Sequence, residues 1–191
     1  TDPTDANIIY VGTGEKRGMG LKGFGVWKTS DRGSTWNQLS SSTGFKWIDT
    51  IIVRDEGGVG AVYVGGGRSL SEGEYTGING LQKSTDGGAT WTEVLGEIAA
   101  GSSHHVTDLE LDSNNRLIVG TRTNTFGDGG GQIFYSDDGA VFSPYTIGAL
   151  GQFDRTFVDV SPSDPNVLYA MFENASTCLL YTSDAADEYS R

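Results

Sequence analysis

Two nine-residue stretches decide the fold of this chain. The first is Lys28-Thr29-Ser30-Asp31-Arg32-Gly33-Ser34-Thr35-Trp36, and the second is Lys83-Ser84-Thr85-Asp86-Gly87-Gly88-Ala89-Thr90-Trp91. A weaker third copy is Tyr135-Ser136-Asp137-Asp138-Gly139-Ala140-Val141-Phe142. In this alignment the aspartates Asp31, Asp86 and Asp137 follow one another at spacings of 55 and 51 residues. Such regular spacing indicates an array of repeated units rather than a set of unrelated domains.

The segments around the three copies repeat as well. Short apolar stretches rich in β-branched residues precede each copy, and such stretches are typical of β-strands. The expected first strands of the units are residues 47–53, 106–111 and 157–160. The expected second strands are residues 8–11, 61–64, 117–119 and 167–169. The expected third strands include residues 25–29 and 80–84. No segment has a convincing amphipathic helical period, so the sequence predicts an all-β protein.

We therefore expect four-stranded antiparallel units, which are the blades of a β-propeller. The unit boundaries are placed at about residues 7–40, 44–95, 104–148 and 153–177. The first unit begins at its second strand and the fourth is a fragment. The chain is thus predicted to hold about three and a half blades of an incomplete propeller.

Each residue type in the repeated stretch has a role in folding. A short aspartate side chain accepts hydrogen bonds from backbone N–H groups a few residues later, and glycine supplies the positive φ of a tight turn. The tryptophan is expected to begin the fourth strand and to bury its ring between sheets. The residues expected to play these structural roles are Ser30, Asp31, Gly33, Thr35, Trp36, Thr85, Asp86, Gly88, Thr90, Trp91, Asp137, Gly139 and Phe142.

The pattern S/T-x-D-x-G-x-T-W resembles the Asp-box, or BNR, repeat. Families with this repeat include sialidases, xyloglucanase-type glycoside hydrolases and the sortilin ectodomain. The stretches Ile9-Tyr10-Val11-Gly12-Thr13-Gly14-Glu15 and Gly25-Val26-Trp27-Lys28 are most similar to the sortilin- and xyloglucanase-like bacterial group. The resemblance covers about residues 1–177 and implies a β-propeller. It implies no particular activity, because the Asp-box is a structural turn and a fold does not fix a function.

Composition excludes several classes of partner. The 191 residues include 13 basic and 25 acidic side chains, for a net charge of −12, so nucleic acid and an anionic membrane surface would be repelled. No stretch approaches 18 apolar residues, so no membrane insertion is expected. The single cysteine, Cys178, does not identify a redox compartment. The family resemblance instead implies a secreted or cell-surface bacterial protein.

Ligand binding is expected on the face opposite the repeated turns. In a four-stranded antiparallel blade the turns alternate between two ends, so all repeated turns lie at one end. The long segments 14–23, 66–80, 95–105 and 122–131 lie at the other end, and long loops on a rigid scaffold commonly carry binding sites. The candidate ligand-binding residues on this face are Glu15, Arg17, Arg68, Glu72, Glu74, His104, His105, Arg122 and Asp128.

These candidates suggest several chemistries, each with a plainer structural alternative. Glycoside hydrolysis needs a pair of carboxylates, but no segment matches a catalytic motif of the xyloglucanase-like enzymes, so no catalytic residue is assigned. Arg17, Arg68 and Arg122 could form an arginine clamp of the sialidase type, although the Arg-Ile-Pro signature is missing. His104 and His105 are neighbours on a strand and point to opposite faces, which disfavours a shared metal. No metal or cofactor is expected.

The last residues depart from the repeat. Residues 178–188 resemble the conceptual translation of a transposase-type sequencing-library adapter, so residues 178–191 are interpreted as an artefactual tail of a metagenomic fragment. The alternative is a genuine, degenerate third strand of the fourth unit. The encoding nucleotide sequence distinguishes the two.

The leading functional hypothesis is a non-catalytic binding or structural propeller. Its ligand would be a glycan or a peptide on the long-loop face, and the remaining blades of the same polypeptide would be its structural partners. The alternative is a glycoside hydrolase, xyloglucanase-like before sialidase-like.

Overall fold

The computed structural model describes residues 1–14, 22–71, 74–78, 80–146, 153–173 and 178–184. In these residues the regular structure is β-strand, apart from one short 3-10 turn, η1 (Ser40–Ser42). The first sheet contains β1 (Ile9–Gly12), β2 (Val26–Thr29) and β3 (Asn37–Gln38) in that order. The second contains β4 (Ile48–Asp55), β5 (Gly60–Gly66), β8 (Leu81–Ser84) and β9 (Thr92–Glu93).

The third sheet repeats the four-stranded arrangement. It contains β12 (His105–Leu111), β13 (Leu117–Arg122), β14 (Ile133–Ser136) and β15 (Ser143–Pro144). The fourth contains β16 (Arg155–Val160), β17 (Val167–Glu173) and β18 (Cys178–Asp184). All of these pairings are antiparallel, and a single pair, Arg122 with Arg155, joins the third and fourth sheets. The segment that resembles a translated adapter thus lies beside β17 as a third strand.

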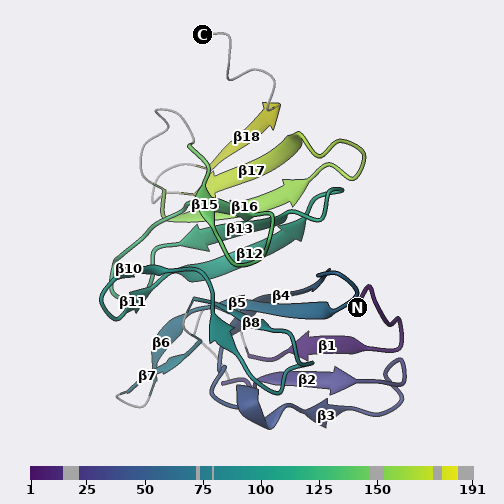
Figure 1. Ribbon diagram of the computed structural model, residues 1–191. Helices are drawn as coiled ribbons and strands as arrows, with labels where there is room; N and C mark the ends of the chain where they lie inside the picture. Colours follow the sequence, from purple (N-terminus) through teal and green to yellow (C-terminus); the bar gives the residue numbers. More distant parts are fainter. Residues whose placement is uncertain (15–21, 72–73, 79, 147–152, 174–177, 185–191) are drawn as a thin grey trace.

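Two short hairpins lie outside the four sheets. They are β6 (Arg68–Ser71) with β7 (Glu74–Gly77), and β10 (Glu97–Ala99) with β11 (Ser102–Ser103). The sequence predicted only loops here, because strands of two to four residues are too short to produce a recognisable alternation. Both hairpins project from the same end of the molecule, on the left in Figure 1.

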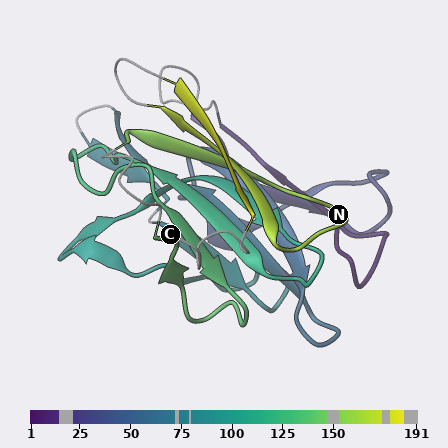
Figure 2. The same cartoon turned by 90° about the horizontal axis from the view of Figure 1, so that it is seen from above.

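The sheets are stacked in chain order, from β1–β3 at the bottom of Figure 1 to β16–β18 at the top. Seen from above, in Figure 2, successive sheets are turned relative to one another. This arrangement of successive antiparallel sheets, of three strands in the first and fourth and four strands in the second and third, is an incomplete β-propeller, as the repeated sequence predicted. In Figure 1 the first repeated turn, between β2 and β3, lies on the right, and the two projecting hairpins lie on the left.

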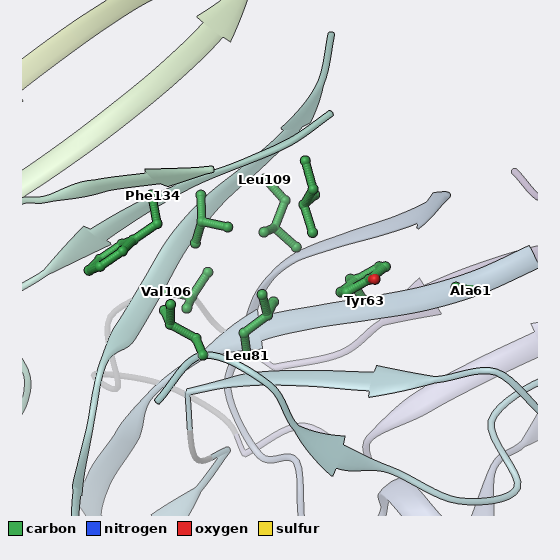
Figure 3. Packing of buried hydrophobic residues seen from close by; sticks show 9 residues of the cluster. Ala61, Tyr63, Leu81, Val106, Leu109 and Phe134 are labelled. Carbon is green, nitrogen blue, oxygen red and sulfur yellow. The ribbon is translucent and has the colours of Figure 1, made fainter. Parts of the chain in front are cut away.

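The hydrophobic core lies between consecutive sheets. One cluster joins the first and second sheets through Tyr10, Val26 and Val62, and another joins the third and fourth through Ile118 and Phe172. The central cluster, shown in Figure 3, packs residues of β5 and β8 against residues of β12, β13 and β14. Each fully buried aliphatic or aromatic side chain contributes about 1.5–3 kcal/mol. The sheets therefore hold one another in place through their faces.

One glycine sets how closely two sheets approach. A Cβ on Gly65 would overlap the side chains of Val106 and Thr50. Because Gly65 has none, the Val106 side chain packs directly on the backbone of β5. This close contact lies near the ends of β5 and β12 that carry the long loops, so it fixes the spacing of the sheets beneath the candidate site.

Candidate functional site

The repeated turns are built around a carboxylate. In the first turn, Asp31 accepts hydrogen bonds from the Thr29 hydroxyl at 2.7 Å and from the Thr35 backbone N–H and hydroxyl at 2.8 and 2.7 Å. Asp86 accepts the equivalent bonds from Ser84 and Thr90 in the second turn. The side-chain bond from Thr29, followed by those from Thr35, lowers the pKa of Asp31 from 3.8 to about 2. These carboxylates have a structural role in the turns.

The structure corrects which hydroxyl residue takes part in the first two turns. The hydroxyl that donates to the aspartate belongs to Thr29 in the first turn and Ser84 in the second, rather than to Ser30 or Thr85. It also accepts a bond from the glycine N–H, which is Gly33 or Gly88.

In the third turn the carboxylate is Asp138 rather than Asp137. Asp138 accepts bonds from Ser136 Oγ and from the backbone N–H groups of Ala140 and Val141. Asp137 instead pairs with Arg116 at 2.7 Å. The reason is geometric, because the carboxylate must lie two residues after the hydroxyl, and this turn is one residue shorter than the others.

The two turn tryptophans differ in burial, and the expectation that both are buried is wrong for Trp36. Trp36 is 38% exposed. Trp91 packs edge-on against Phe45, with ring centroids 5.4 Å apart, and its indole N–H donates to Ser41 Oγ. Trp91 is covered by a segment that follows the first sheet, whereas in the described part of the chain no sheet precedes the one that carries Trp36. In the third turn, Phe142 packs against the central core cluster.

The turn end of the molecule is also where neighbouring sheets are connected by hydrogen bonds. Lys28 Nζ donates to the Gly87 carbonyl at 3.4 Å, and Lys83 Nζ donates to the Gly139 carbonyl at 3.2 Å. Each lysine is paired across its sheet with a tyrosine, Tyr10 or Tyr63, and lies over that ring. The polar groups of this end are therefore used in contacts between sheets.

The opposite end, which we call the long-loop face, brings together three of the four segments expected there. A small pocket is lined by residues from 66–80, 95–105 and 122–131. The lining residues are Gly67, Arg68, Ile78, Gly80, Ser103, His104, His105, Asn124, Thr125 and Phe126. Its cavity volume of about 10 Å³ accommodates about one water molecule and no sugar ring. The pocket is thus a junction between loops rather than a ligand cavity.

His104 and His105 both line this pocket, but in different environments. His105 Nε2 lies 2.8 Å from Asp49 Oδ2, and the backbone of Gly67 packs against its Nδ1. His104 is buried edge-on against Phe134, and burial lowers the pKa of its imidazole. His105 thus connects the third sheet to the second, whereas His104 packs within the third sheet. Within the described residues no group of three or more metal-ligating side chains occurs.

Asp49 was missed by the sequence analysis. It lies near the start of β4, inside a stretch that was read only as an apolar strand. Its partner His105 is 56 residues away, so no local signal in the sequence could reveal the contact.

The segment 122–131 is held by side chains. Asp128 accepts a hydrogen bond from Ser102 Oγ at 2.6 Å. The Asn124 side-chain amide donates to that Ser102 Oγ at 2.9 Å. The Arg68 guanidinium lies over the Phe126 ring, 5.9 Å from its centre, and Phe126 is 46% exposed. Asp128 therefore organises the loop, while Phe126 offers an aromatic surface to solvent.

A second, larger pocket adjoins the first at Asn124. It has a cavity volume of about 330 Å³, which falls in the range of small-molecule sites. Its lining residues are Arg122, Thr123, Asn124, Asp154, Arg155 and Glu173. Sequence reasoning selected Arg122 alone, because the others lie at strand ends that come together only when β13, β16 and β17 pair.

The remaining candidates contribute less to the site. Glu15, Arg17 and Glu72 lie outside the described residues, and Glu74 lies on β7 in the projecting hairpin. Arg68 lines the small pocket and Arg122 lines the large one. The structure therefore does not bring these two arginines into one pocket.

Comparison with known sequences finds xyloglucanases. The chain is 29% identical over 182 residues to xyloglucanase Xgh74A of Acetivibrio thermocellus, a match that covers 88% of this chain and 20% of that protein. It is 29% identical over 140 residues to a xyloglucanase of a Paenibacillus species, covering 62% of this chain and 12% of the relative. A xyloglucanase of Hypocrea jecorina is 24% identical over 196 residues, covering 90% and 20%. No family model matches.

Comparison with solved structures gives the same fold. The crystal structure of an ancestral GH74 enzyme superposes with a TM-score of 0.66 and 21% identity, covering 97% of this chain and 22% of that one. The chain spans about a fifth or less of the length of the curated relatives it matches. No helix in the described residues is long and apolar enough to cross a membrane.

Proposed function

We propose that this chain forms part of the glycan-binding face of a xyloglucanase-like glycoside hydrolase. The observation that supports it is the similarity to three xyloglucanases, which extends over up to 90% of the chain. These relatives favour the hydrolase alternative over the leading hypothesis of a non-catalytic propeller. The Asp-box and sortilin-like resemblance remains an interpretation of the repeated turns.

The long-loop face has the chemistry that a polysaccharide needs. Phe126 supplies an apolar ring on which a sugar ring can stack, and the amide of Asn124 and the guanidinium of Arg122 lie in the adjoining segment. At the turn face, by contrast, Lys28 and Lys83 are used in contacts with neighbouring turns. The polysaccharide would therefore lie across the long-loop face.

The proposal assigns binding, and no catalytic residue, to this chain. Glycoside hydrolysis uses two carboxylates that flank the scissile bond. Asp128 is engaged by Ser102, and Glu15 and Glu72 lie outside the described residues. We propose that the pair is completed by the remaining blades of the same polypeptide, in a secreted or cell-surface protein.

Exposed apolar side chains on the fourth sheet support the proposal of further blades. Tyr63 is fully buried on the second sheet, because the third sheet covers it. Tyr169 and Met171, on β17 of the fourth sheet, are about 40% exposed. A following four-stranded sheet would cover them as the third sheet covers Tyr63. That sheet would follow the four proposed units, residues 7–40, 44–95, 104–148 and 153–177.

Binding to defined oligosaccharides tests this function. Isothermal titration of the full chain with a xyloglucan oligosaccharide should show binding, and titration with a sialylated oligosaccharide should show none. Phe126→Ala should weaken xyloglucan binding, whereas Val141→Ala, a change at an exposed apolar side chain on the turn face, should not. Absence of xyloglucan binding by the native chain would contradict the proposal.

A further inference from the structure

The larger pocket of the long-loop face has walls fixed by the backbone. The Thr123 N–H donates to the Asp154 carbonyl at 2.7 Å, and the Asp154 N–H donates to the Glu173 carbonyl at 2.8 Å. Arg122 and Arg155 are directly paired across β13 and β16, and Arg155 is paired with Glu173 across β16 and β17. These three charged residues thus stand side by side on adjacent strands, where the third and fourth sheets meet.

Arg155 is the most constrained of the lining side chains. Its side chain is 8% exposed, its Nη1 lies 3.2 Å from Glu173 Oε2, and its guanidinium lies over the Phe157 ring. Its buried Nε has no hydrogen-bond partner among the described residues. Burial and the ion pair with Glu173 restrict this guanidinium to one orientation beside the pocket. Fixed charges on a rigid frame are suited to selective binding.

The charges of the pocket balance. Arg122 and Arg155 carry two positive charges, and Asp154 and Glu173 carry two negative charges. A guanidinium only donates hydrogen bonds and an ionised carboxylate only accepts them. A sugar hydroxyl does both, so adjacent hydroxyls can bridge a guanidinium and a carboxylate. A pocket with balanced charges gives an anionic sugar no net attraction, and the net charge of −12 on the chain disfavours it.

We propose that this pocket binds one neutral sugar ring through adjacent hydroxyls and rejects sugars that carry a carboxylate. Arg155 and Glu173 are the specificity-determining residues, and Asp154 and Asn124 complete the rim. The proposal rests on the function proposed above, because it places one ring of the polysaccharide in a defined pocket. It adds a site and a selectivity rule that the similarity to xyloglucanases does not provide.

The experiment measures affinities by isothermal titration of the full chain. The probes are a neutral xyloglucan oligosaccharide and an oligosaccharide of equal length that contains glucuronic acid. The native chain should bind the neutral probe and not the acidic one. Glu173→Gln and Arg155→Lys should each weaken binding of the neutral probe about tenfold or more, the usual worth of a hydrogen bond to a charged group. Asp159→Asn, on the same strand β16 but outside the pocket, should leave the affinity unchanged.

The outcomes separate this proposal from the broader one. If the native chain binds no neutral oligosaccharide, the proposed function is wrong and the pocket assignment is wrong with it. If it binds, but the pocket variants bind within twofold of the native chain, only the pocket assignment is overturned. Equal or tighter binding of the acidic probe overturns the selectivity. If Arg155→Lys loses the near-ultraviolet circular dichroism of the folded chain, a second variant is needed. Asp154→Asn, a change at an exposed side chain, then tests the loss of affinity for the neutral probe in a folded protein.

Discussion

The two ends of the stacked sheets are held together in different ways. At the turn end the same contacts recur, since Tyr10 with Lys28 and Tyr63 with Lys83 each reach the glycine of the following turn. At the long-loop end each connection is different. One carries the hairpin β6–β7, another carries β10–β11, and a third is closed by a bridge between Thr123 and Gly129.

This difference separates stability from recognition. Repeated contacts at the turn end help to fix the spacing and angle between the first three sheets, together with strand contacts such as that of Val106 on Gly65. The loops are therefore free to differ in length and chemistry on a scaffold that does not depend on them. The two pockets formed at the long-loop end are the consequence.

The third sheet departs from the repeat and shows that the Tyr–Lys pair is not the only solution. Ile118 and Tyr135 occupy the paired positions, and Arg116 lies over the Tyr135 ring. Here the contact with the fourth sheet is apolar, through Ile118, Val158 and Phe172. Buried apolar area thus replaces a polar contact at an equivalent place.

Two glycines give the sharpest test of the comparison. Both Gly139, at the turn end, and Gly127, at the long-loop end, have positive φ. A Cβ on Gly139 would overlap the Tyr63 hydroxyl and the Glu56 carboxylate, whereas one on Gly127 would meet nothing. Gly139→Ala should lower the free energy of unfolding by about 3 kcal/mol, from backbone strain and overpacking.

Gly127→Ala should cost about 1 kcal/mol, from backbone strain alone. Urea denaturation of both variants measures the difference. Equal losses of unfolding free energy in the two variants would show that packing constrains the turn end no more than it constrains the long loops.

A smaller effect is expected when one hydroxyl of the turn end is removed. Tyr63 donates to Glu56 at 2.5 Å, and Glu56 also pairs with Lys83 at 2.7 Å. Tyr63→Phe should therefore destabilise the chain by about 1–2 kcal/mol, because the partly buried Glu56 carboxylate loses one of its donors. The matched variant Tyr10→Phe, at the equivalent position of the first sheet, should cost less. Thermal denaturation followed by circular dichroism compares the two, and a larger loss for Tyr10→Phe would contradict the assignment.

The turn carboxylates predict how stability depends on pH. Hydrogen bonds to Asp31 and Asp138 lower the pKa of each carboxyl from 3.8 to about 2 in the folded chain. Because the folded-state pKa lies below the unfolded value, these turns stabilise the chain above about pH 4 and lose that contribution as the pH falls toward 2. Melting temperatures measured between pH 6 and pH 2 should fall in the acid part of this range.

Asp31→Asn should reduce this acid sensitivity while leaving the rest of the profile in place. An unchanged profile in that variant would count against the structural role of the carboxylate.

The smallest change in stability is expected at the long-loop end. Phe126 is half exposed, so Phe126→Ala should change the free energy of unfolding by about 0.5 kcal/mol or less. The matched variant Phe134→Ala, at a buried ring of the central cluster, should cost about 3–5 kcal/mol. Urea denaturation measures both. A large loss of stability in Phe126→Ala would show that the long-loop face contributes to the scaffold. Stability and recognition would then not be divided between the two ends.

The sequence alone was sufficient for the fold because the repeated stretches are local. A hydroxyl, an aspartate, a glycine and an aromatic residue within nine positions specify a turn, and β-branched stretches at constant distances specify the strands around it. Even here the third turn was placed one residue early, since only the hydrogen bonds distinguish Asp138 from Asp137. The exposure of Trp36 also depended on which sheet lies beside it, which a single unit does not reveal.

The candidate site was decided by tertiary structure. The sequence indicated which end of the sheets would carry long loops, and it selected Arg122 and Asp128 there. It could not select Asp49, Asp154, Arg155 or Glu173, because each is an unremarkable residue at the end of a strand. Asp49 becomes the partner of His105, and the other three come to line one charged pocket, only when strands from different units pair and stack. Turns are specified by neighbours in the chain, whereas sites between sheets are specified by residues about 20 to 60 positions apart, and only folding brings those together.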